Sequence, residues 1–299
     1  MPAMPAPSPL SLPVDLSRLP QMQLVEVNHG LERDKTIAGV KARMKAWGFD
    51  FDVGRLASDP AVALIEEVAY RRALGLQTIN DAGKQLTLVH SYGPYLDHIA
   101  ATYYADVQAA RLEGETDDRF LRRLLLAAHA RSVGSLEGYE YWALTLAPAL
   151  ADARALNHSS GLVARGDIAL VVAAAPGAVD EADQVEAVRV GLSARGRHHA
   201  TDVLTVRAAV RRPYSVSATL LGRPGPDPAP VIAEAQARLQ AFAADRRRVG
   251  RPITNSGLHA ALTVAGVEGV RLAADMDIDP GPDGICELEA FGLFWDVMP

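Results

Sequence analysis

One stretch of the sequence, residues 59–104, constrains the fold more than any other part of the chain. It begins with Asp59 and Pro60, which favour a helix start because a carboxylate accepts from free amides and proline tolerates the first helical position. A Gly-Pro step at residues 93–94 ends the pattern, and a second helix is expected from residue 95. Between these points apolar residues recur at helical spacing and predict one apolar stripe, formed by Ile65, Val68, Ala69, Leu76 and Ile79.

Helical signals continue beyond this stretch, so residues 31–148 as a whole predict a mainly helical region. Residues 116–118 (Thr-Asp-Asp) form an acidic helix start, and an apolar face follows them. Gly134 and Ser135 then provide a break and a new N-cap, and Pro148 marks the end of the last helix.

The character of the sequence changes after about residue 160. Residues 167–174 are a short apolar run typical of a buried strand, and residues 180–194 have helical spacing with acids at the front. Residues 203–210 and 214–220 each alternate between apolar and polar side chains. The tight Arg-Arg-Pro connection between them predicts a β-hairpin with one face exposed to solvent.

Two more helices, at residues 231–242 and 256–264, and a strand at 267–272 complete this half of the chain. The order of strand, helix, two strands, two helices and strand is close to the split β-α-β unit of ferredoxin-like domains. We therefore predict an α+β fold, in which a helical N-terminal domain precedes a ferredoxin-like domain. Helices should cover one face of its four-stranded sheet.

The first 20 residues carry prolines at positions 2, 5, 7, 9, 13 and 20. Such a segment is expected to be extended, either as a disordered tail or as an arm laid across a neighbouring subunit. The arm is favoured by the apolar side chains of Val14, Leu16 and Leu19, because a purely solvated tail would leave them exposed to water. The predicted divisions are an extended arm at 1–30, a helical domain at 31–158, a ferredoxin-like domain at 159–274 and a C-terminal tail at 275–299.

Composition excludes several classes of function. The net charge of -6 argues against a general nucleic-acid binder, which usually needs a basic face. Cys286 is the only cysteine, so no intramolecular disulfide can form, which fits assembly in a reducing cytoplasm. No run approaches the ~20 apolar residues of a bilayer span, and the N-terminus lacks the features of a signal peptide, so no membrane insertion is expected.

Candidate chemical sites are weak. His198 and His199 are adjacent, so on a strand they point to opposite faces, and a helical metal pair needs a spacing of three or four. The acids at Asp275, Asp277, Asp279 and Asp283 approach a calcium loop, but Pro280 replaces the glycine that the turn requires. No phosphate-binding loop or nucleophile elbow is present. We therefore expect no enzyme activity, metal or cofactor. The alternative is a small metal-dependent hydrolase that uses the two histidines and the 275–283 acids.

A group of tyrosines surrounds the Gly-Pro break. Bases can stack on such rings, but nucleic-acid platforms interleave them with cations, and here histidine, alanine and leucine intervene. Packing in the core or at a subunit interface is the favoured interpretation. The group consists of Tyr70, Tyr92, Tyr95, Tyr103 and Tyr104.

The order of these features resembles the baseplate J-like family of contractile phage tails. That family has a Leu-(Leu/Ile)-Glu-Glu-x-x-Tyr-Arg helix, a Gly-x-x-Leu-Asp turn, a Glu-x-Asp-x-x-(Phe/Tyr)-x-x-Arg helix and a Gly-Ser step before a tyrosine-bearing helix. Here the matching residues are Leu64–Glu67 with Tyr70 and Arg71, Gly93–Asp97, then Glu115, Asp117, Phe120 and Arg123, then Gly134, Ser135, Tyr139 and Tyr141. The resemblance runs from about residue 13 to residue 272.

The resemblance implies a structural subunit of the baseplate wedge, located in the virion tail and assembled in the bacterial host cytoplasm. Copies of the chain would form a ring around the central spike hub with tail-protein-I-like and wedge-protein-W-like subunits, and would couple baseplate rearrangement to sheath contraction. No direct contact with nucleic acid is expected. A stand-alone oligomeric binding module is a further alternative. The predicted interface residues are Val14, Leu16, Leu19, Tyr70, Arg71, Arg207 and Arg211.

Overall fold

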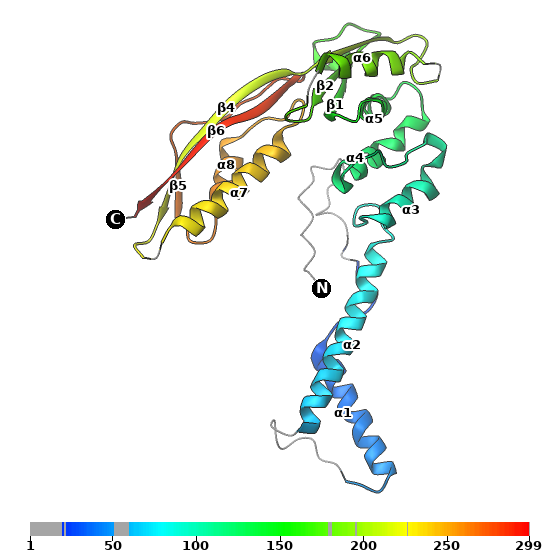
Figure 1. Ribbon diagram of the computed structural model, residues 1–299, viewed down its shortest axis with the longest axis vertical. Coiled ribbons are helices and arrows are strands. Elements are labelled where there is room, and N and C mark those ends of the chain that lie inside the picture. The colour runs from blue at the N-terminus through cyan, green and yellow to red at the C-terminus, as the bar shows by residue number, and fades with distance from the viewer. Residues whose placement is uncertain are drawn as a thin grey trace. The chain divides into compact units, whose positions relative to one another are not determined.

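The computed structural model forms two compact units, one ending at Thr102 and the other running from Tyr103 to the C-terminal end (Figure 1). The predicted arm residues Val14, Leu16 and Leu19, and the predicted cap Asp59, lie outside the described residues. The division into four domains stays a prediction. The structure describes residues 20, 22–50, 60–178, 181–194, 196–225 and 227–298.

The N-terminal unit is helical, as the sequence predicted. Asn28 caps the first helix by accepting from the amide of Leu31. Gly93 adopts a positive φ of 54°, and Pro94 then begins the last helix, which explains the break in the apolar pattern. The three helices are α1 (His29–Ala46), α2 (Pro60–Lys84) and α3 (Pro94–Tyr103).

A buried asparagine ties the segment before α1 to α2. The Oδ1 atom of Asn80 accepts from the amides of Leu24 at 2.8 Å and Val25 at 2.9 Å. Its Nδ2 donates to the carbonyl of Val25 at 2.9 Å. Asn80 is only 4% exposed, so these bonds replace those that the amide loses to water on burial.

The larger unit begins with two helices, α4 (Asp117–Ala127) and α5 (Leu136–Leu146). Thr116 and Ser135 cap them by accepting from the amides of Arg119 and Gly138, which confirms both predicted helix starts. Short 3₁₀ turns accompany them, η2 (Ala105–Val107) and η3 (His129–Arg131).

The first sheet contains β1 (Leu150–Leu156), β2 (Asp167–Ala174) and β3 (Val203–Ala208), in that order. The turn η4 (His158–Ser160) lies between β1 and β2, which are antiparallel, and α6 (Glu181–Leu192) connects β2 to the parallel β3. A parallel pair requires such a crossover. Helices α5 and α6 pack against this sheet and against each other.

The second sheet contains β4 (Val210–Gly222), β5 (Gly269–Leu272) and β6 (Gly284–Val297), with β4 in the centre. The short β5 is antiparallel to β4, whereas β6 runs parallel to β4 along its whole length. Helices α7 (Ala229–Arg246) and α8 (Asn255–Leu262) lie on one face of this sheet (Figure 1).

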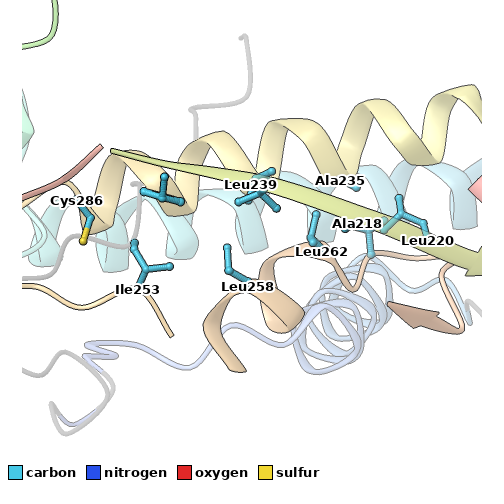
Figure 2. Close-up of a cluster of buried hydrophobic side chains, with 11 residues drawn as sticks. Ala218, Leu220, Ala235, Leu239, Ile253, Leu258, Leu262 and Cys286 are labelled. Atoms are coloured by element: carbon cyan, nitrogen blue, oxygen red, sulfur yellow. The ribbon is translucent and has the colours of Figure 1, made fainter. Parts of the chain in front are cut away.

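The core of the second sheet is contributed by all of these layers. Figure 2 shows Leu239 of α7 near Leu258 of α8, whereas Leu220 of β4 lies farther along the same cluster, beside Ala218. Each of these three leucines is fully buried. Cys286 of β6 is a buried free thiol at one end of the same cluster. Within the described part of the chain, no helix has the length and apolarity that a bilayer span requires.

The predicted hairpin between residues 203–210 and 214–220 is wrong. The two strands belong to different sheets, because consecutive amides bond in different directions: Ala209 donates to Val172 of β2, and Val210 donates to Asp283 before β6. The described strands form two three-stranded sheets and not one four-stranded ferredoxin-like sheet. The coarser α+β class is confirmed.

The residues read as a turn, Arg211 to Pro213, continue the long strand β4. Proline is normally excluded from a central strand because it has no amide to donate. Here β5 pairs only with residues 218–221, so among the described strands Pro213 has a partner on one side only, that of β6. This edge position accommodates the proline.

Candidate assembly surfaces

Helix α2 carries several large apolar side chains that remain exposed. Ile65, Ala69 and Ala73, four residues apart, are buried. At 100° per residue, the members of the predicted stripe lie within about 100° of one another, so they do share one side of the helix. Ile65 and Ala69 are buried, whereas Val68 and Ile79 are about half exposed, so the unit covers only part of the stripe. The exposed fractions are 69% for Leu64, 53% for Val68, 49% for Leu74 and 48% for Ile79.

Other large apolar side chains of the same unit are also exposed. Four of the five predicted tyrosines are exposed, which favours the interface over the core for them. An apolar surface of this extent is typical of a contact with another protein. We call the side chains Leu64, Val68, Tyr70, Leu74 and Ile79 the α2 apolar face. Exposed residues outside it include Leu31, Trp47, Phe49, Leu86, Tyr92, Tyr95 and Tyr103.

A buried acid joins α1 to α2. Glu32 is 3% exposed and forms ion pairs with Lys35 at 2.7 Å and with Arg72 of α2 at 2.5 Å. The hydrogen bond from Lys35, opposed by desolvation and helped by the charges of Lys35 and Arg72, lowers the pKa of Glu32. This charged contact holds α1 against α2. It does not involve the side chains of the α2 apolar face.

The predicted interface residues have different surroundings. Tyr70 is 53% exposed, and Arg71 pairs with Glu67 one turn earlier at 2.7 Å. These two residues lie in the N-terminal unit, whereas Arg207 and Arg211 lie in the larger unit, so the structure places the pairs in separate units.

Arg207 and Arg211 are engaged inside their own unit. Arg207 of β3 pairs with Asp283 at 2.9 Å. Arg211 of β4 pairs with Glu181 at 3.0 Å and lies 3.6 Å from Glu287 of β6. Both arginines therefore help to hold the two sheets together, and a change at either would affect this contact as well as any surface that they present.

The Glu-x-Asp-x-x-Phe-x-x-Arg motif forms a buried ion network around α4. Glu115 accepts from Arg119 at 2.5 Å and from two nitrogens of Arg123, at 3.0 and 2.7 Å. The guanidinium of Arg123 has no exposed surface. It lies 5.2 Å from the ring centroid of Phe120, and Arg111 lies over the same ring at 4.6 Å.

This network connects α4 to the elements that follow it. Arg119 donates to the carbonyls of Leu144 at 2.8 Å and Leu150 at 3.2 Å. Burial alone would raise the pKa of Glu115, but hydrogen bonds from Arg123 and Leu112 and the adjacent guanidinium charges outweigh it and lower the pKa. The spacing of four places Arg119 and Arg123 on one face of α4, and Glu115 lies just before the N-cap Thr116. The motif therefore specifies how α4 packs.

A second network lies where the two sheets meet, and the sequence reading did not identify it. Asp152 of β1 accepts from Arg122, and its Oδ2 accepts from the amide of Val249 at 2.7 Å. Gly250 donates to the carbonyl of Gly284 at 2.7 Å. An apolar cluster beside these bonds joins both sheets, formed by Leu156, Ala169, Val171, Ala173, Ala209, Val249 and Ile285.

A cavity of about 550 Å³ opens at this junction. Glu140 contributes to its wall and accepts from the amide of Ala155 at 3.0 Å. Burial, together with the charge of Asp152, raises the pKa of Glu140 to about 7. Residues of α4, α5 and β1 form one side, and residues 248–252 form the other.

The residues of the predicted metal alternative are not assembled into a site. The Nδ1 atom of His198 lies 2.8 Å from the carbonyl oxygen of Leu192. The Nδ1 atom of His199 lies 2.8 Å from the hydroxyl oxygen of Thr201. Asp275 and Asp277 instead accept from Asn255, the first residue of α8. Over the residues that the structure describes, no three histidine, cysteine or acidic side chains are grouped as metal ligands would be.

Comparison with known proteins gives similarities of three kinds. The sequence profile of the Baseplate J-like N-terminal domain matches residues 57–112. Baseplate protein J of Escherichia phage P2 is 32% identical over 235 residues, which cover 74% of this chain and 76% of that protein. A chain in the six-fold symmetrised baseplate of the anti-feeding prophage matches with a TM-score of 0.37 and 15% identity over 58% of this chain, and the match spans 42% of that solved chain.

Proposed function

This chain belongs to the baseplate J-like family, and we propose that it is a wedge subunit of the baseplate of a contractile phage tail or tail-like particle. Its general role, as a structural protein of a phage tail baseplate, follows from its similarity to baseplate protein J. In the proposed arrangement, several copies form a ring around the central spike hub. Tail-protein-I-like and wedge-protein-W-like subunits complete the wedge, and movement of the wedge starts sheath contraction.

The observation that carries the proposal is the α2 apolar face. A helix that is apolar on both sides is normally buried on both sides. In this unit α1 and the Asn80 contact account for one side of α2, while Leu64 and Val68 remain more than half exposed. We infer that helices of neighbouring subunits cover this face in a bundle.

The larger unit is proposed to close the ring. Each of its sheets ends in a strand whose outer side has no partner among the described strands, β3 in one sheet and β6 in the other. Such edges pair readily with strands of other chains. Repeated copies related by rotation need contacts of this kind on two sides of the molecule.

The test is a charged substitution on the α2 apolar face. Val68→Asp adds a charge that a bundle would have to bury, so we expect particles to lack this chain and the free chain to fold as before. The readout is the amount of this chain in purified particles, measured by mass spectrometry, with circular dichroism of the isolated chain. Gln240→Asp, at an exposed position of α7, is the matched control. Normal incorporation of the Val68 variant would contradict the proposal.

A further inference from the structure

The cavity at the junction of the two sheets is lined by four arginines and two acids. The arginines are Arg122, Arg154, Arg248 and Arg251, and the acids are Asp152 and Glu140. The proposed assembly gives this cavity no role. On its wall, the positively charged side chains outnumber the acidic ones.

The acids cannot neutralise the four arginines. Both carboxylate oxygens of Asp152 already accept, from Arg122, from the amide of Val249 and from its neighbour Ala153. Glu140 has a pKa raised to about 7, so near neutral pH it carries only part of a charge. Asp245, outside the lining, lies 3.4 Å from Arg251. A surplus of positive charge therefore remains in the cavity.

Of the four arginines, Arg248 has a buried donor that lacks a partner: its Nε atom is buried and donates to no partner among the described residues. Burial, and then repulsion from Arg122, lowers the pKa of Arg248. A buried donor without a partner is costly, and an oxygen ligand would satisfy it.

Gly250 makes room for a second guanidinium. It has a φ of 73°, and the Nη1 atom of Arg154 occupies the place where a Cβ on residue 250 would lie. Arg154 uses this space to donate to the carbonyl of Val249 at 3.3 Å. Any residue with a side chain at 250 would displace Arg154 from the wall of the cavity and strain the backbone.

We propose that this cavity binds an oxyanion, a carboxylate or phosphate group that bridges Arg248 and Arg154. Guanidinium groups pair with planar or tetrahedral oxyanions through two parallel N–H bonds, which suits the fork of donors that these arginines present. Because the cavity is larger than one oxyanion needs, it also accommodates the side chain that carries a carboxylate, as on an acidic segment of a neighbouring protein.

Isothermal titration calorimetry of the full chain near neutral pH tests the proposal. Inorganic phosphate and a blocked tetraglutamate peptide are the probes, each compared with sodium chloride at equal ionic strength. Saturable binding of at least one probe is expected, and Arg248→Gln should weaken it about tenfold or more. Tetraglutamate binding tighter than phosphate would assign the oxyanion to a protein carboxylate, and the reverse order would assign it to free phosphate.

Arg238→Gln is the matched control, because Arg238 is an exposed arginine of α7 that pairs with Glu234. Arg251→Gln and Gly250→Ala supply independent variants of the cavity should Arg248→Gln fail to fold by circular dichroism. No saturable binding of either probe beyond the chloride control would overturn the proposal. So would binding that all folded cavity variants leave unchanged.

Discussion

Single buried charges determine how the elements of the larger unit fit together. Arg123 has no exposed surface, and its charge is compensated by Glu115 at 2.7 Å. A buried ion pair contributes little when both partners are present, because desolvation offsets the attraction, but loss of one partner leaves an uncompensated charge. The motif residues are therefore mutually dependent, which explains why they occur together in the sequence.

Replacement of Arg123 should be strongly destabilising. Arg123→Met leaves Glu115 buried with fewer donors, and we expect the free energy of unfolding to fall by about 3–5 kcal/mol. Urea denaturation followed by circular dichroism measures the change. Arg189→Met, at an exposed arginine paired with Glu186, should leave the free energy of unfolding nearly unchanged. The double variant Arg123→Met with Glu115→Gln should recover part of the lost stability. Equal losses of stability in Arg123→Met and Arg189→Met would contradict the buried-pair explanation.

The raised pKa of Glu140 predicts that the stability of the folded chain depends on pH. Its pKa is raised from 4.5 to about 7 in the folded chain, so the folded state holds a proton that the unfolded state has released. Stability is therefore complete below about pH 4.5 and falls as the pH rises to about 7, by roughly 3 kcal/mol at about 1.4 kcal/mol per pKa unit.

Glu140→Gln removes this titration and keeps an oxygen for the amide of Ala155. The variant should be more stable than the wild type above pH 7 by about that amount, and equally stable near pH 4.5. Unfolding midpoints across this range measure it, with the exposed Glu137→Gln on the same helix as the charge control. A gain that is the same at all pH values would argue against a titrating Glu140.

At the scale of helices and strands, local chemistry decided what could be predicted from the sequence. Helix starts were predictable where a capping side chain is present, as at Thr116 and Ser135, because these bonds involve residues three apart. The Gly-Pro break at residues 93–94 was predictable for the same reason. The strands themselves were also recognisable, because alternation is a local property.

Strand pairing was not predictable from the same patterns. An alternating run such as residues 203–208 has the same appearance in a hairpin and in a parallel pair, and only the crossover helix α6 decides between them. The junction network was missed because Asp152 and Val249 are 97 residues apart and neither lies in a motif. The α2 apolar face was missed because periodicity identifies apolar positions without stating which of two sides is covered.

At the scale of the whole molecule, the chain combines an apolar helical unit with a unit fixed by charge networks. The helical unit exposes the side chains of the α2 apolar face. The larger unit holds its two sheets together through Asp152, Arg207 and Arg211. This division fits a subunit that associates through one unit and keeps its geometry in the other, as the proposed wedge would require.

The most direct test of this proposal is the accessibility of Val68 before and after assembly. Cys286, the only native cysteine, is 1% exposed, so a cysteine placed at residue 68 would be the reactive thiol. Val68→Cys should react quickly with a maleimide in the isolated chain and become protected in assembled particles, while Gln240→Cys reacts in both. Equal labelling of Val68→Cys in the free chain and in the particle would contradict assembly through the α2 apolar face.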